Sequence, residues 1–125
     1  MKCGFCEIIA GRAPVYILYE SEKVIAFLDI NPVTSGHTRV VPREHVMCLD
    51  DIKDLSLMQE MMAAMIHLSR RMLNRGICEE FSVLQANGIW ANQSIAHVHF
   101  HLISRHEGDG VHLHLPTNVQ DAKQK

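Results

Sequence analysis

Three histidines alternate with apolar residues between positions 97 and 103, where the chain reads HVHFHLI. Successive side chains of a β-strand point to opposite faces, so a strand here would turn the apolar residues toward a core and gather three imidazoles on the other face. An imidazole can act as a base, a nucleophile or a metal ligand, and it is costly to bury unpaired. An ordinary half-exposed strand would more often carry Thr, Lys, Ser or Glu at these positions. We therefore predict a chemical site built on His97, His99 and His101.

The surrounding sequence predicts an antiparallel sheet that would hold this site. Apolar runs bounded by turn-forming residues predict strands at 15–19, 23–28, 37–41, 81–86 and 97–104. Clusters of turn formers predict loops at 29–36 and 87–94. A long helix is expected from Asp50 or Asp51, either of which can cap it, to about Asn74, with Gly76 as its terminator. Together these elements predict an α+β domain, with helices on one side of the sheet.

Composition indicates an ordinary globular protein and argues against two classes of partner. The chain has 125 residues, of which 47% are hydrophobic and 21% charged, which suits one domain with a substantial core. A formal net charge of −2 gives no electrostatic case for nucleic-acid binding. No run approaches the roughly 18–20 apolar residues of a membrane span. The first residues do not resemble a signal peptide, so we expect reduced cysteines and a cytoplasmic protein.

Several blocks of the chain together resemble the histidine triad (HIT) family of nucleotide hydrolases and transferases. The run at 97–103 matches the family's motif of three alternating histidines. Further matches follow in family order at 3–11 (CGFCEIIAG), 26–38 (AFLDINPVTSGHT), 40–45 (VVPREH), and at the pairs Asn87-Gly88 and Gln93-Ser94. The match covers about 3–105, so residues 1–125 are expected to form a single HIT domain whose tail is 106–125. The resemblance, nearest to the Hint-like and microbial branch, implies a five-stranded antiparallel sheet with one long and one short helix.

Two positions depart from the family pattern. Asn92 stands where glycine is usual before the triad, and Asn is the residue that best tolerates a left-handed backbone after Gly. Ser104 stands where many members carry proline. Neither change touches a reacting group.

The resemblance assigns catalytic roles to histidines and to the loop before them. It implies that His99 is the nucleophile and forms a nucleotidyl-histidine intermediate that water then cleaves. It implies that His101 and His37 donate to the α-phosphate oxygens, where charge accumulates in the transition state. Ser94, with Gln93, resembles the family's leaving-group and phosphate contacts. A loop serine that caps its own backbone is the alternative for Ser94.

The resemblance also implies a nucleoside pocket. Asp29 would accept hydrogen bonds from both ribose hydroxyls. Ile30 and Phe27 would form apolar walls for the base, and Asn87 would be a further polar contact. For Phe27, an ordinary place in the core is the alternative.

A C-x-x-C pair begins the chain and suggests a metal site. Cys3 and Cys6, with His45 and His97, would make a tetrahedral site for a structural Zn²⁺. This set resembles the zinc site of many family members. Such a site would fasten the N-terminus to the catalytic strand. The alternative is a pair of reduced thiols without a metal.

The long helix carries more apolar surface than one sheet face needs. Met61, Met65 and Leu68 widen its predicted stripe, which suggests a partner. The resemblance implies a two-fold homodimer in which this helix and the strand beginning near Phe81 meet their symmetry mates. The stripe itself is expected to comprise Leu55, Met58, Met62, Met65, Ile66, Ser69 and Met72 or Leu73.

The function implied is hydrolysis at the α-phosphate of nucleoside 5′-phosphoramidates or related nucleotides, with a purine nucleotide (an AMP derivative) as substrate and a nucleoside monophosphate as product. One alternative is a Fhit-like dinucleoside polyphosphate hydrolase. Another is a zinc-stabilised nucleotide-binding protein with little turnover, against which the retained His99, His101 and His37 argue. A catalytic metal on the histidines is weaker, because no carboxylate lies near them in sequence.

Overall fold

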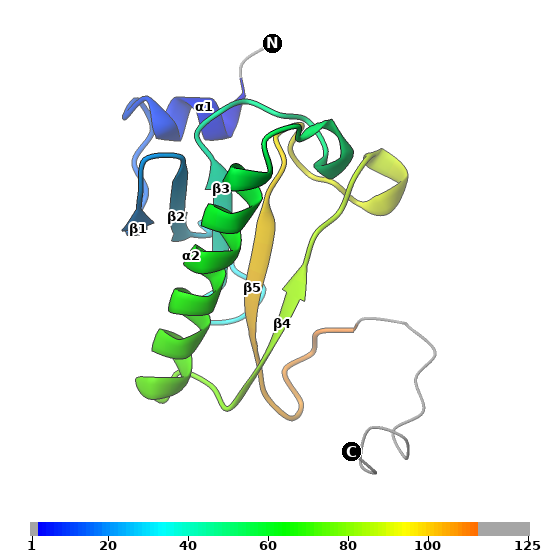
Figure 1. Cartoon of the computed structure of the whole chain (residues 1–125). Helices are drawn as coiled ribbons and strands as arrows, with labels where there is room; N and C mark the ends of the chain where they lie inside the picture. Colours follow the sequence, from blue (N-terminus) through cyan, green and yellow to red (C-terminus); the bar gives the residue numbers. More distant parts are fainter. Residues whose placement is uncertain (1–2, 113–125) are drawn as a thin grey trace.

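The computed structural model describes residues 3–112, so residues 113–125 of the expected tail lie outside the described part. Five strands form one sheet in the order β1-β2-β3-β5-β4, and all neighbours are antiparallel (Figure 1). The α+β prediction, with one long and one short helix, is confirmed. The elements are α1 (Gly4–Ile9), β1 (Ile17–Glu20), β2 (Val24–Leu28), β3 (Thr38–Pro42), η1 (Leu49–Asp51), α2 (Leu55–Asn74), β4 (Glu80–Leu84), η2 (Ile89–Ala91) and β5 (Phe100–Arg105).

The two helices cover opposite faces of the sheet, so the expectation of helices on one side is wrong. Helix α2 packs on Val24, Ala26 and other residues of one face. Helix α1 covers the other face, where Phe5 packs with Ile25 and Phe27. The physical reason lies in β2, where four successive apolar residues are all buried. A strand that is apolar at every position needs cover on both faces.

Helix α2 begins later than the sequence suggested. Its N-cap is Asp54, whose side chain accepts from the Ser56 amide at 2.9 Å, and not Asp50 or Asp51. Those two residues lie in the short turn η1, where Asp51 accepts from the Cys48 amide. The helix ends at Asn74 as expected, and Gly76 follows at a φ of 71°.

The buried stripe of α2 is rotated from the expected one. Met62 and Ile66, predicted to face the core, are 38% and 50% exposed. Ala64 lies inside the true stripe, but a pattern based on large apolar residues overlooks it. A small residue at such a position lets a helix approach a sheet closely. Met65, Met61 and Leu68, expected to extend toward a partner, lie within the core of the single chain. The buried residues are Leu57, Met61, Ala64, Met65, Leu68 and Met72.

Strand β4 forms one edge of the sheet, beyond the cover of α2. The helix packs on β2, β3 and β5, and β4 pairs with β5 alone. Phe81 and Val83 of β4 are therefore exposed, alongside the outward Met62 and Ile66 of α2. Within residues 3–112, no helix has the length and apolar character needed to span a bilayer.

Candidate active site

The three alternating histidines lie together on the α1 face. Only His101 falls within β5, which begins at Phe100, but the alternation extends back along the preceding segment. Val98, Phe100 and Leu102 are buried as predicted. On the other face the His99 ring centroid lies 4.8 Å from that of His101 and 5.0 Å from that of Phe5. The sheet thus gathers the imidazoles under helix α1.

The hydrogen bonding of His99 fixes which ring nitrogen can react. Its Nδ1 lies 2.8 Å from the carbonyl oxygen of His97. A carbonyl only accepts, so Nδ1 carries the proton and Nε2 keeps a free lone pair. Burial lowers the pKa of His99, which favours the neutral ring. The arrangement therefore presents a neutral imidazole nitrogen.

A chain of hydrogen bonds also fixes His101. The Val33 amide donates to His37 Nδ1 at 3.1 Å, so His37 carries its proton on Nε2. That nitrogen lies 2.8 Å from His101 Nδ1, which must accept. His101 therefore holds its own proton on Nε2, as a donor. Burial, with the nearby charges of His99, His37 and Arg39, lowers the pKa of His101 to about 4.

Asp29 comes close to these histidines in space, although it is distant in sequence. Its Oδ2 lies 3.7 Å from His37 Nδ1, so a carboxylate does lie near the histidines in space, although none is near the triad in sequence. Oδ1 accepts from the Asn31 amide at 2.8 Å and Oδ2 from Arg39 Nε at 2.6 Å. Burial alone would raise the pKa of Asp29, but the Asn31 amide and the Arg39 charge outweigh it and hold the pKa below its ordinary value. The carboxylate is therefore ionised.

A pocket of about 580 Å³ opens beside Asp29. Three predicted nucleoside contacts line it, namely Asp29, Ile30 and Phe27. Phe27 also belongs to the α1-side core, so its two interpretations hold together. Most of the remaining wall is apolar and comes from α1, the segment after it, and Ile95. A flat, largely apolar group with a polar edge fits such a site.

Gln93 holds the loop before the triad in place, because both its amide oxygen and its amide nitrogen bond to other protein groups. Its Oε1 accepts from the Gly88 amide at 2.7 Å and from the Cys48 thiol. Its Nε2 donates to the carbonyls of Met47 and Ile95 at 2.7 and 2.9 Å. The side chain therefore braces η2 against the segment before η1, two turns that lie close together in Figure 1.

Asn87 has a similar bracing role, and Ser94 does not. Asn87 Oδ1 accepts from the Leu49 amide at 2.8 Å, and the Asn87 and Gln85 amides pair with each other. Ser94 is exposed, and its hydroxyl bonds to no other residue within 3–112. The structure therefore places Asn87 away from the lining of the apolar pocket and leaves the Ser94 hydroxyl available.

The four residues of the expected metal site converge. Cys3 Sγ and Cys6 Sγ lie 3.4 and 3.7 Å from His97 Nδ1, and Cys6 Sγ lies 3.3 Å from His45 Nδ1. Bonds of about 2.3 Å to sulfur and 2.0 Å to nitrogen in a tetrahedron put neighbouring ligand atoms about 3.5 Å apart. His97 Nε2 donates to the Pro42 carbonyl at 2.8 Å, which leaves the Nδ1 lone pair facing the cysteines. The donor set and its spacing fit a zinc ion.

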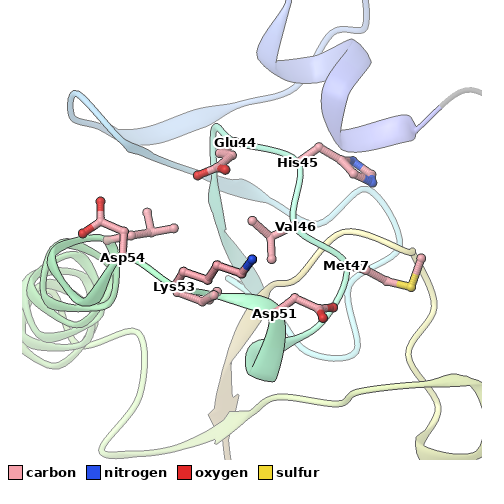
Figure 2. Close-up of a pocket in the computed structure, with 9 residues that line it drawn as sticks. Glu44, His45, Val46, Met47, Asp51, Lys53 and Asp54 are labelled. Atoms are coloured by element: carbon pink, nitrogen blue, oxygen red, sulfur yellow. The ribbon is translucent and has the colours of Figure 1, made fainter.

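A separate hollow of about 370 Å³ lies between the segment after β3 and the start of α2 (Figure 2). Of the four residues of the expected zinc site, only His45 lies on its wall, which also carries Glu44, Lys53 and Asp54. No triad histidine lines it. The chemistry described above therefore belongs to the α1 face.

Two residues near the triad were missed by sequence reasoning. Phe5 contacts the rings of Phe27, His97 and His99 edge-on, and thereby packs α1 onto the site. Arg39 pairs with Asp29 and lies over the Phe5 ring. A charged residue inside the apolar run 38–42 was the available signal for Arg39.

Comparison with known proteins settles the family. The family model described as HIT domain matches residues 10–108. The chain belongs to the HIT family. It is 41% identical over 108 residues to a HIT-like protein of Methanocaldococcus jannaschii, covering 86% of this chain and 82% of that protein. It is 36% identical over 120 residues to the adenosine 5′-monophosphoramidase of Saccharomyces cerevisiae, covering 95% and 73% respectively.

Solved HIT structures share the fold. A HIT family protein from Bacillus subtilis superposes with a TM-score of 0.86 at 37% identity, covering 97% of this chain and 86% of that one. The histidine triad nucleotide-binding protein from Candida albicans gives a TM-score of 0.82 at 32% identity, covering 98% and 91%. The five-stranded sheet with its two helices is therefore the HIT fold.

The two departures of this HIT domain are accommodated locally. Asn92 adopts φ 69° and ψ 31°, the left-handed conformation expected at that position. Ser104 is buried, and its hydroxyl donates to the Ser35 carbonyl at 2.7 Å. The Thr34 hydroxyl in turn donates to the Ser104 carbonyl at 2.8 Å. These bonds fasten the loop that leads into His37 to strand β5.

Proposed function

We propose that this HIT protein hydrolyses nucleoside 5′-phosphoramidates or related α-substituted nucleotides, with AMP derivatives as substrates, through a nucleotidyl-histidine intermediate on His99. The observation that carries the proposal is the bond from His99 Nδ1 to the His97 carbonyl, which directs the Nε2 lone pair away from the protein backbone. A relative named adenosine 5′-monophosphoramidase at 36% identity supports the same reaction class.

The chemistry would proceed in two displacements at phosphorus. His99 Nε2 attacks the α-phosphorus, an N–P bond forms, and the bond from phosphorus to the leaving nitrogen breaks. The departing nitrogen takes a proton from water and leaves as a neutral amine. Water then attacks phosphorus and returns a proton, the bond to His99 breaks, and the nucleoside monophosphate is released. Throughout, His99 Nδ1–H stays bonded to the His97 carbonyl.

The other site residues would position the nucleotide and stabilise charge. His101, with its proton on Nε2, would donate to an α-phosphate oxygen. Both ring nitrogens of His37 are engaged within the protein, so His37 would act through His101 and not directly on phosphate. Asp29 would accept from the ribose hydroxyls, and the exposed Ser94 hydroxyl would donate to the leaving group. Gln93 and Asn87 would hold the loop that carries Ser94.

Two experiments test this function. Rapid quenching of the working enzyme should trap a nucleotidyl group on His99, located by mass spectrometry of the digested peptide. On one preparation, kcat/KM for an adenosine phosphoramidate should exceed that for a diadenosine polyphosphate. A preference of more than tenfold for the polyphosphate would favour the Fhit-like alternative.

The metal site and the assembly complete the proposal. Cys3, Cys6, His45 and His97 would hold one structural Zn²⁺, which would tie the start of α1 to the segment that leads into the triad. A homodimer would form through the outer flank of α2 and the edge strand β4, where Met62, Ile66 and Leu73 lie exposed beside Phe81 and Val83. The opposite flank of α2 is already used, because Glu60 and His67 contact the β1–β2 hairpin.

A further inference from the structure

Arg39 occupies a central position on the α1 face of the sheet. Its backbone pairs with that of Phe27 in β2 on one side and with that of His101 in β5 on the other. Residues directly opposite each other in antiparallel strands point to the same face. Phe27, Arg39 and His101 therefore form a row across three neighbouring strands.

This row follows the order of the parts of a 5′-nucleotide. Phe27 lines the apolar pocket at one end, and His101 belongs to the triad at the other. A nucleotide joins base, ribose and phosphate in that sequence, so a base in the pocket and a phosphate at the triad leave the ribose beside Arg39. Arg39 itself lines the pocket, and its Nε lies 2.6 Å from Asp29.

The guanidinium of Arg39 has donors to spare. Its Nε donates to Asp29, and its Cζ lies 5.3 Å from the centroid of the Phe5 ring. Among residues 3–112, its terminal nitrogens Nη1 and Nη2 have no hydrogen-bond acceptor. The side chain is 17% exposed, and no fully buried side-chain nitrogen among residues 3–112 lacks a partner, so these terminal donors are accessible to a ligand from the pocket. Asp29 is complementary, because each of its oxygens accepts one protein hydrogen bond and retains a further lone pair.

We propose that Arg39 donates to a ribose hydroxyl oxygen while Asp29 accepts from ribose hydroxyl hydrogens, which makes this pocket specific for ribonucleotides over deoxyribonucleotides. The inference rests on the proposed nucleotide site. A hydroxyl is both donor and acceptor, so it satisfies both members of the Arg39–Asp29 pair. A deoxynucleotide would leave a partly buried charged group without its partner, which a site built for a hydroxyl penalises strongly.

Binding of AMP, 2′-deoxy-AMP and 3′-deoxy-AMP to the full chain, measured by calorimetry, tests this role. A hydrogen bond to a charged group contributes about 1.5–3 kcal/mol, so the wild-type protein should bind AMP about 10- to 100-fold more tightly than at least one deoxynucleotide. Arg39→Met keeps a long side chain against Phe5 and removes the donors. It should weaken AMP binding about tenfold or more, and binding of that deoxynucleotide by less than about twofold.

Matched variants keep the test decisive. Arg43→Met removes an arginine just beyond the opposite end of β3, which bonds to Ser21 and Glu20 outside the pocket, and should leave all three affinities unchanged. If Arg39→Met unfolds because Asp29 loses its partner, Asp29→Asn/Arg39→Met is compared with Asp29→Asn, since neither leaves a buried carboxylate unpaired. In that comparison too, adding Arg39→Met should weaken the binding of AMP more than the binding of the deoxynucleotide.

Two results would overturn the ribose role. One is equal wild-type affinity for all three nucleotides. The other is an equal loss for all three on removal of Arg39, which would assign Arg39 to the phosphate. Binding needs no turnover, so a failure to hydrolyse phosphoramidates would count against the proposed function and leave this result readable.

Discussion

The two faces of the sheet are buried by different means. On the α2 face, a cluster of apolar side chains such as Val24, Val40 and Leu102 packs against the helix. On the α1 face, Phe5 and Phe27 share the burial with His97, His99 and Asp29. A buried polar group is tolerated when it is hydrogen-bonded, and among residues 3–112 no fully buried side-chain nitrogen or oxygen lacks a partner.

The two faces differ in the kind of contact they make: apolar packing on the α2 face and directional hydrogen bonds on the α1 face. The α2 face can be repacked with apolar residues of similar volume, because its contacts have no direction. On the α1 face each imidazole has one nitrogen tied to a named acceptor or donor, and that bond decides what the other nitrogen can do. Changes on the two faces should therefore have different kinds of effect.

The largest effect is expected on the α1 face. His99→Ala should lower kcat by at least roughly 10³-fold, because a covalent route disappears, while nucleotide binding stays measurable. Steady-state kinetics and calorimetry on the same preparation check both parts. His106→Ala, at an exposed position outside the site, is the matched control. Residual activity of His99→Ala within tenfold of wild type would rule out the covalent mechanism.

Which side chains gather on the α1 face was more predictable from sequence than how they are hydrogen-bonded. The alternation at 97–103 predicted which side chains share a face, because the period of a strand is fixed. It could not show that His37 bonds to His101, because that depends on the loop held by Thr34 and Ser104. Gln93 and Asn87 were predicted as substrate contacts, and the sequence did not show that both bond to the distant segment 47–49.

For the α2 face, the sequence predicted that a long helix is present but not which of its residues face the sheet. The long helix was identified, but its stripe was assigned from large apolar residues and left out the small Ala64, which is buried in the core. The cap was placed three or four residues too early, at Asp51 or Asp50 where the structure uses Asp54. Tertiary packing decides between such alternatives.

The second prediction tests the outer flank of α2. Ile66 is half exposed on this flank, so Ile66→Glu should place a charge in the proposed dimer interface, where two-fold symmetry doubles it. The wild-type protein should sediment as a dimer at micromolar concentration and the variant as a folded monomer. His67→Glu, on the opposite flank of the same helix, should remain dimeric. Met65→Glu would not be informative, because Met65 is 6% exposed and its loss would unfold the chain.

A wild-type monomer at micromolar concentration would contradict the dimer. A dimeric Ile66→Glu variant would instead move the interface away from this flank of the helix.

The third prediction concerns the proposed zinc site at the edge of the α1 face. Metal analysis should find about one zinc per chain, and Cys3→Ser/Cys6→Ser should lower the Tm more than it lowers kcat at low temperature, because structural zinc binding is coupled to folding. Cys48→Ser, a thiol outside the ligand set, should retain the metal. A metal-free wild-type preparation whose Tm is unchanged by a chelator would dismiss the site.

The smallest effect expected is a pH dependence of stability specific to the α1 face. Burial, with the charges of His99, His37 and Arg39, lowers the pKa of His101 to about 4, whereas an unfolded histidine titrates near about 6.5. Between these values the unfolded chain binds the extra proton. The stabilisation from neutral His101 is therefore complete above about pH 6.5 and is lost as the pH falls toward 4, with a slope of at most about 1.4 kcal/mol per pH unit. Buried His37, whose pKa is also lowered, adds in the same direction.

Urea unfolding of wild type and His101→Asn from pH 7.5 to pH 5 measures this contribution. The variant should lose less free energy of unfolding over that range, because it has one fewer histidine to protonate on unfolding. Both proteins keep the four candidate metal ligands, so protonation of those residues cancels in the difference. His106→Asn, at an exposed position, should follow the wild-type curve. Parallel curves for wild type and His101→Asn would mean that the burial of His101 on the α1 face does not hold its ring neutral.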